Sequence, residues 1–96
     1  MSDVFDALAH PARRRILKML RKRPHTAGEI ADVFDLAKPT LSGHFSVLKA
    51  ARLISAERNG TSILYRLNMS VLEEALSALM SIAGRLPKRA AQGEPK

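Results

Sequence analysis

The chain has 96 residues and a formal net charge of +7, with 16 Lys or Arg against nine Asp or Glu. This length suits one domain with a modest core, which small domains often complete by dimerising. The excess of cations favours a polyanionic partner, of which nucleic acid is the commonest. The sequence contains no cysteine, which excludes disulfides and thiolate metal sites and fits a cytoplasmic protein.

Membrane insertion is not expected. No apolar run approaches the roughly 18 residues of a membrane-spanning helix. The segment MSDVFDALAH at the N-terminus lacks the basic and apolar regions of a secretory signal.

The first predicted helix covers residues 3–9 and has one apolar face, formed by Val4, Phe5 and Leu8. It is expected to end before Pro11, because the residue that precedes a proline avoids the α conformation. Proline also suits the first turn of a new helix, where its missing N–H group costs nothing.

The second predicted helix covers residues 11–22 and is strongly basic. Its core-facing residues are Ile16, Leu17 and Leu20. Residues 10–23 contain no acid and seven cations, which are Arg13, Arg14, Arg15, Lys18, Arg21, Lys22 and Arg23. These cations either form a solvated face or meet phosphate groups. The repulsion among them favours phosphate, so Arg13 is included among the candidate DNA contacts.

A helix-turn-helix is expected next. Thr26 and Glu29 have capping-box spacing, which predicts the start of a helix that buries Ile30, Val33 and Phe34. Three residues connect it to a helix over residues 38–52, whose apolar residues Leu41, Phe45 and Leu48 fall at i, i+4 and i+7. Two short helices with so short a connection are typical of this motif.

The outer face of the helix over residues 38–52 is small, polar and free of carboxylates. Such a surface suits the DNA major groove, where base edges offer distinct donors and acceptors. An ordinary amphipathic surface helix is the alternative. The candidate DNA contacts here are Lys38, Pro39, Thr40, Ser42, Gly43 and His44. His44 lies at the edge of this face, where it contacts DNA or packs beside the apolar stripe.

A β-hairpin is predicted after Leu53. Two runs of alternating hydrophobicity flank Asn59-Gly60, a pair typical of a type I′ turn. A helix-turn-helix followed by a hairpin is a winged helix. Arg58 and Asn59 would then lie in the wing and are candidates for a phosphate or minor-groove contact, although both are ordinary hairpin residues otherwise.

The last predicted helix runs from Asn68 or Ser70 to about Arg85 and is too apolar to be covered on one side only. A membrane-surface helix is the alternative, but its acidic Glu73 and Glu74 disfavour anionic lipid. The sequence thus predicts one folded domain over residues 1–86 and a disordered basic tail over residues 87–96.

Four segments carry a family resemblance: ALAHPARRRILKML, TAGEIADVF, KPTLSGHFSVLKAARLI and ILYRLN. Together they resemble the ArsR/SmtB family of bacterial winged-helix repressors, most closely its SdpR-like autorepressor branch, over about residues 3–84. The resemblance implies a mainly α fold with a small β-hairpin, in the order of four helices, two strands and a helix. It also implies operator binding through residues 38–52 and a dimer made by the first and last helices. The expected interface residues are Val4, Phe5, Leu8, Leu72, Leu76, Leu79 and Ala83.

The sequence departs from the family in ways that bear on function. It lacks the Cys-x-Cys of thiolate-sensing members, and its last helix lacks the Asp and His of zinc-sensing members. No metal site and no cofactor are therefore expected. Ala37 stands where a Ser or Asn usually caps the recognition helix, which would weaken the helix start by roughly 1 kcal/mol. Gly43 replaces a bulky polar residue, which removes one base contact and allows close approach.

These features favour a homodimeric, sequence-specific DNA-binding repressor that controls its own gene and has no metal site. An enzyme is not expected, because the sequence shows no catalytic triad, phosphate-cradling glycine loop or paired carboxylates. Two alternatives stay open. One is a basic interaction module that binds an acidic partner, and the other is a repressor that senses an unidentified ligand at the dimer interface.

Overall fold

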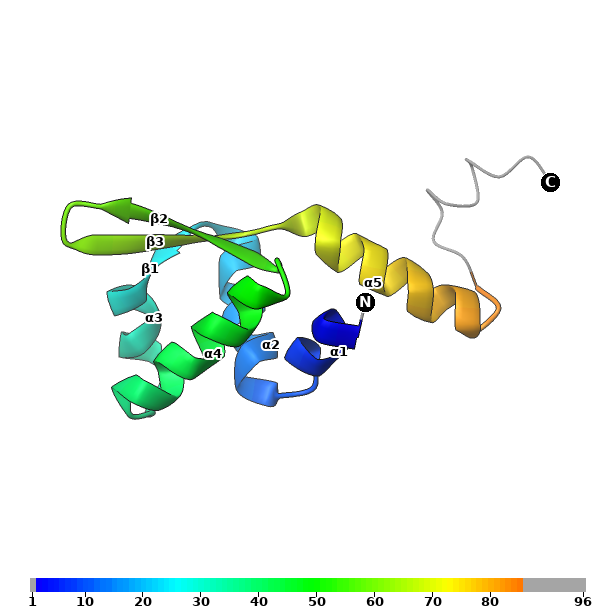
Figure 1. The fold of residues 1–96 in the computed structure, drawn as a ribbon, viewed down its shortest axis with the longest axis horizontal. Helices are drawn as coiled ribbons and strands as arrows, with labels where there is room; N and C mark the ends of the chain where they lie inside the picture. The colour runs from blue at the N-terminus through cyan, green and yellow to red at the C-terminus, as the bar shows by residue number, and fades with distance from the viewer. Residues whose placement is uncertain (1, 86–96) are drawn as a thin grey trace.

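The computed structural model describes residues 2–85, which form five helices and a three-stranded antiparallel sheet (Figure 1). The elements are α1 (Ser2–Leu8), α2 (Pro11–Lys22), β1 (His25–Thr26), α3 (Ala27–Val33), α4 (Lys38–Ala50), β2 (Ile54–Asn59), β3 (Ser62–Leu67) and α5 (Met69–Ile82). This arrangement confirms the predicted winged helix-turn-helix and its mainly α class. The predicted tail over residues 87–96 lies outside the described residues.

The helix starts follow from local hydrogen bonds. His10 caps α2, because its Nδ1 accepts a hydrogen bond from the Ala12 amide at 3.1 Å. The predicted capping box opens α3: the Glu29 amide donates to the Thr26 hydroxyl at 3.1 Å, and the Thr26 amide donates to the Glu29 carboxylate at 2.9 Å. This hydrogen bond from Thr26 holds the pKa of Glu29 below its usual range.

The hairpin is present, but its turn differs from the predicted type I′. Asn59 pairs with Ser62, so the two loop residues are Gly60 and Thr61. Gly60 has a φ of +66°. Thr61 does not have a positive φ, since Arg52 is the one non-glycine residue with positive φ within residues 2–85. A positive φ at the first loop residue alone is the pattern of a type II′ turn, in which glycine takes that position.

The sheet has a third strand that the sequence did not predict. The two residues of β1 pair with β3, His25 opposite Tyr65 and Thr26 opposite Leu64. The strand order is therefore β1-β3-β2, with β3 in the centre. This short strand attaches the connection between α2 and α3 to the wing.

One core joins the helices to the sheet. Its fully buried large side chains are Ile16, Ile30, Leu48 and Leu53. Phe45 of α4 stacks on Tyr65 of β3 with ring centroids 4.4 Å apart, and burial raises the pKa of that tyrosine. The expectation that Val33 is buried is wrong: it is 45% exposed, because α3 ends at this residue and turns it outward.

The last helix, α5, extends away from the body of the protein on the side opposite the tip of the hairpin (Figure 1). Its fully buried residue is Ala75, whereas Leu76 and Leu79 are about half exposed. Within residues 2–85, no helix combines the length and the hydropathy needed to cross a membrane.

Candidate nucleic-acid interface

The recognition-helix candidate α4 is fixed by its buried side. Leu41, Phe45 and Leu48 enter the core at the predicted spacing. The end of the helix is set by a Schellman motif, in which the Leu53 amide donates to the Leu48 carbonyl and the Arg52 amide to the Lys49 carbonyl. The opposite side of α4 is therefore held rigidly outward.

That outward side contains most of the predicted contact residues. The exposed residues of α4 are Lys38, Pro39, Thr40, Ser42, Gly43, Ser46, Val47, Lys49 and Ala50. A Cβ added at Gly43 would meet no atom within 4 Å, so the packing of the protein does not require glycine there. What the glycine provides is a low surface that lets another molecule approach the helix backbone.

The start of α4 has no side-chain cap, as the Ala37 residue at the N-cap position predicted. The Leu41 amide donates to the Ala37 carbonyl at 3.0 Å, which is a backbone contact only. Amide groups before Leu41 are left to solvent or to a ligand, and a helix start of this kind favours a phosphate.

The structure corrects the interpretation of His44 and Arg13. His44 is only 7% exposed, and its Nδ1 lies 3.2 Å from Nη1 of Arg13. The same guanidinium donates to the carbonyls of Ala7 at 2.8 Å and Asp6 at 3.0 Å. His44 is thus buried and Arg13 half-buried, and both are engaged in contacts within the protein that join α1, α2 and α4.

The environment of His44 favours its neutral form. Burial lowers its pKa, and the neighbouring His10 and Arg13 lower it further. The ring of His10 lies 4.5 Å from that of His44, centroid to centroid. Because the Arg13 guanidinium can only donate, the arrangement assigns the acceptor role to Nδ1 and the proton to Nε2.

The wing and the start of α4 lie at the same end of the molecule, with α3 between them in the view of Figure 1. Arg58 and Asn59 are exposed at the tip end of β2. Along the hairpin, Arg66 and Glu57 form an ion pair at 3.5 Å.

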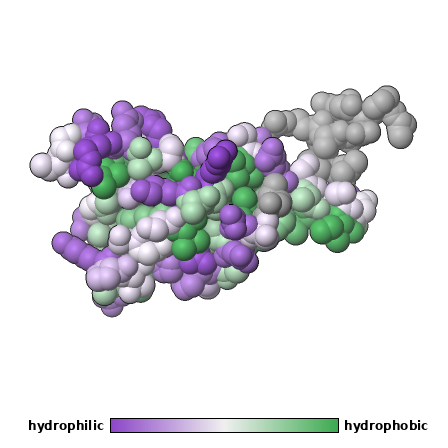
Figure 2. All heavy atoms as spheres, in the orientation of Figure 1, coloured by the Kyte–Doolittle hydropathy of each residue, from purple (hydrophilic) through white to green (hydrophobic). Residues whose placement is uncertain are grey.

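The predicted dimer-interface residues differ in exposure. Val4 is only 7% exposed and belongs to the core of its own protomer, which corrects its assignment to the interface. Phe5, Leu8 and Leu72 are half-buried, and Leu76, Leu79 and Ala83 are exposed. Among residues 2–85, the most exposed large apolar residue is Ile82 at 82%, which was not in the predicted set. Figure 2 shows apolar surface at the far end of α5 and polar surface over the wing.

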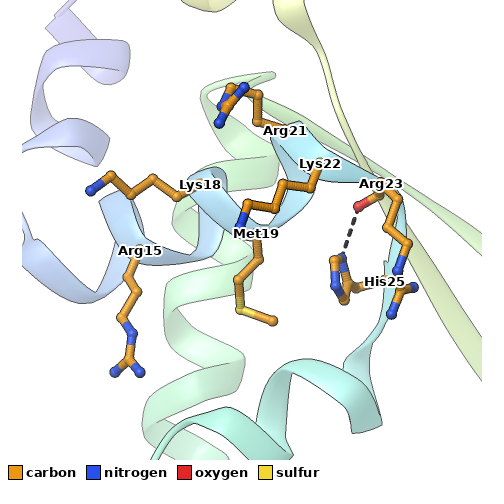
Figure 3. A pocket seen from close by; sticks show the side chains of 7 residues that line it. All are labelled: Arg15, Lys18, Met19, Arg21, Lys22, Arg23 and His25. Atoms are coloured by element: carbon orange, nitrogen blue, oxygen red, sulfur yellow. Dashed lines mark hydrogen bonds between the residues drawn. The ribbon is translucent and has the colours of Figure 1, made fainter.

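Most of the other cations of α2 and its C-cap lie around a single hollow. Five of them surround an open hollow on the outer side of α2 (Figure 3), namely Arg15, Lys18, Arg21, Lys22 and Arg23. Among residues 2–85, no group of three or more His, Cys, Asp or Glu is placed to hold a metal ion.

Known proteins share this sequence and fold. The model of a family described as a helix-turn-helix domain matches residues 8–55. The transcriptional repressor SdpR of Bacillus subtilis is 39% identical over 85 residues, which cover 88% of this chain and 94% of the repressor. The transcriptional repressor SmtB of Mycobacterium tuberculosis is 37% identical over 65 residues, which cover 68% of this chain and 48% of that protein.

Solved structures of similar fold point to the same family as these relatives. The crystal structure of an ArsR family transcriptional regulator matches with a TM-score of 0.79 and 28% identity, covering 86% of this chain and 90% of that one. The relatives and structural neighbours are transcriptional regulators and not enzymes. The chain therefore belongs to the ArsR/SmtB family of winged-helix, DNA-binding transcriptional repressors.

Proposed function

We propose that this repressor acts as a homodimer on an operator in the promoter of its own gene, with no bound metal. The observation that carries the proposal is the small, polar outer face of α4 together with an exposed wing at the same end of the molecule. Lys38, Pro39, Thr40, Ser42 and Gly43 would face the major groove, and Arg58 and Asn59 the flanking backbone. Such a regulator acts where the bacterial chromosome lies, in the cytoplasm.

The exposed apolar side of α5 supports the dimer. Leu76, Leu79 and Ile82 are 51%, 49% and 82% exposed, and a contiguous apolar surface of this kind marks an interaction site. A symmetric pair would bury α5 against the partner's α5 and α1 and leave both wings free. Two α4 helices related in this way suit a pseudo-palindromic operator with half-sites about one DNA turn, or roughly 34 Å, apart.

Autorepression is proposed from the resemblance to the autorepressor branch of the family. Its test is a footprint over the DNA upstream of the coding region, followed by a titration of that fragment at two salt concentrations. We expect a protected palindrome and an affinity about 10³-fold lower at 200 mM than at 50 mM salt, because a dimer neutralises several phosphates. Equal affinity for this fragment and for random duplexes would contradict the proposal and favour a non-specific cationic binder.

A further inference from the structure

The outer side of α2 forms a second charged surface, here named the α2 basic face. It consists of Arg15, Lys18, Arg21, Lys22 and Arg23, and with Met19 and His25 it surrounds a hollow of about 640 Å³ (Figure 3). All five cations are exposed. Lys18 and Lys22 lie on the side of α2 opposite the buried Ile16, Leu17 and Leu20, and Arg21 lies beside them at the edge of that side. Arg23 follows the helix as its C-cap residue.

Little of this charge is neutralised within the protein. Arg23 pairs with Glu29 at 3.5 Å, and the Arg15 guanidinium lies 4.8 Å from the ring centre of Phe34. In the part of the chain that the structure describes, no carboxylate lies within ion-pair distance of Lys18, Arg21 or Lys22. Three close cations without a counter-charge repel one another, and a bound polyanion would remove that repulsion.

The α2 basic face and the outer face of α4 point in opposite directions. The core packs between the two helices, since α2 buries Leu17 and Leu20 on its inner side and α4 buries Phe45 and Leu48 on its own. Figures 1 and 3 show the two helices from different sides. In Figure 1 α4 lies in front of α2, and in Figure 3 α2 lies in front of α4. Duplex DNA is stiff over about 150 base pairs. A duplex seated on α4 therefore does not reach the α2 basic face without a sharp bend.

We propose that the α2 basic face binds the phosphate backbone of a second nucleic acid segment, so that the operator-bound repressor can hold two duplexes at once. Arg15 and Lys22 are separated by about 10 Å along the helix axis, a length over which one DNA strand presents about three phosphates. Met19 is the one apolar side chain lining the hollow within the described residues. An acidic protein partner would need more apolar surface to anchor it.

The test is a capture experiment with an immobilised operator fragment. The repressor is loaded onto the fragment and washed, and its retention is measured first. A fluorescent duplex of about 60 base pairs without an operator is then added. The retention of the repressor reports on the proposed function, and the capture of the second duplex reports on the α2 basic face, so the two can fail separately.

The variant changes Lys18, Arg21 and Lys22 to Gln, which keeps the helix propensity and touches no buried residue. A matched control changes Lys88, Arg89 and Lys96 to Gln and removes the same charge elsewhere. We expect the wild type to capture the second duplex and to lose about 40-fold in that affinity between 50 and 200 mM salt, as three phosphate contacts predict. The triple variant should lose capture at least 10-fold and bind the operator within about 3-fold of the wild type, while the control should capture normally.

Three results would overturn the proposal. The first is no capture by the operator-bound wild type at 50 mM salt, including the case in which an acidic peptide is retained instead. The second is equal loss in the triple variant and the control, which would show that only the net charge matters. The third is a parallel loss of operator binding and capture in the triple variant, which would place this surface on the operator itself.

Discussion

The guanidinium of Arg13 and the buried ring of His44 form a contact of 3.2 Å that connects α2 to α4. Through its other nitrogens Arg13 donates to the Asp6 and Ala7 carbonyls at the end of α1. A cation at this end of a helix satisfies carbonyl groups that the helix leaves unpaired and interacts favourably with its dipole. One side chain thus fixes α1 and α4 relative to each other.

Replacing Arg13 by Met should destabilise the protein by about 2 kcal/mol, because hydrogen bonds from a charged group contribute roughly 1.5–3 kcal/mol when buried and less when partly exposed. The melting temperature should fall by roughly 10 °C. Arg14 offers a matched control, since its exposed guanidinium donates to the Leu8 carbonyl alone at 2.7 Å. Arg14→Met should cost less than about 1 kcal/mol. Equal losses in the two variants, measured by thermal or urea unfolding, would show that Arg13 has no special role.

The stability of the protein should fall as the pH drops below about 6.5. Burial lowers the pKa of His44 in the folded protein below its ordinary value of 6.5, which applies to the unfolded chain. At a pH between the folded and the unfolded pKa, the unfolded chain therefore binds a proton that the folded protein does not bind. The contribution of neutral His44 is therefore complete above about pH 6.5 and is lost on acidification. In His44→Gln, an amide oxygen can still accept from Arg13, and part of the pH dependence of the stability below about pH 6.5 should disappear. Identical slopes for the variant and the wild type in urea unfolding would contradict this.

Local signals explain what could be predicted from the sequence. Thr26 and Glu29 form their capping box within four residues of chain, and the apolar residues of α4 repeat along a single helix. The hairpin was found from its alternation, and its turn was misplaced by one residue, because Asn59 extends the strand pairing. Patterns of this kind are visible in a sequence because the residues that interact are close in it.

The missed features depend on residues that are far apart in the chain. Arg13 and His44 are separated by 31 positions, and no spacing rule connects them. The two residues of β1 are too few to show alternation. Val4 was correctly identified as apolar, but a pattern cannot tell whether an apolar residue is covered by its own chain or by a partner. Charge patterning likewise identified the cations of α2 without showing on which side of the fold they lie.

Arg52→Gly should stabilise the protein by about 1 kcal/mol. Arg52 has a φ of +63° in the Schellman motif that ends α4, a conformation in which a side chain is strained and glycine is not. Gly84 occupies the equivalent place after α5, with a φ of +77°. Arg52→Ala is the control, because it removes the guanidinium and keeps the strain, and it should change the stability by less than about 0.5 kcal/mol. Equal stabilisation by both substitutions would mean that charge and not backbone conformation is responsible.

Leu76→Glu should convert the proposed dimer to a folded monomer, because it would place a charge in the apolar contact proposed between protomers. Leu76 is 51% exposed in the single chain, so the substitution should leave the fold of the protomer intact. Ser81→Glu adds the same charge at an exposed position on another side of α5 and should leave the dimer unchanged. Sedimentation at micromolar concentration distinguishes these outcomes. A folded Leu76→Glu protein that sediments like the wild type would exclude this interface.

The last prediction separates base recognition from backbone contact. Ser42 lies in the exposed second turn of α4, where a recognition helix meets base edges, so Ser42→Ala should cost roughly 1–3 kcal/mol on the operator and relax its preference at one or two base pairs. Lys38→Ala should weaken binding to all duplexes alike and reduce the salt slope by about one if Lys38, at the helix start, contacts only phosphate.

Arg58→Ala should resemble Lys38→Ala, since a side chain at the tip end of a hairpin neutralises phosphate more easily than it identifies a base. All three residues are exposed, so none of the changes removes core packing. Titrations on the operator and on a scrambled duplex at two salt concentrations give both the ratio of affinities and the salt slope. If Ser42→Ala leaves the ratio unchanged while Arg58→Ala abolishes it, the wing identifies the sequence and α4 serves mainly to position the protein on the backbone.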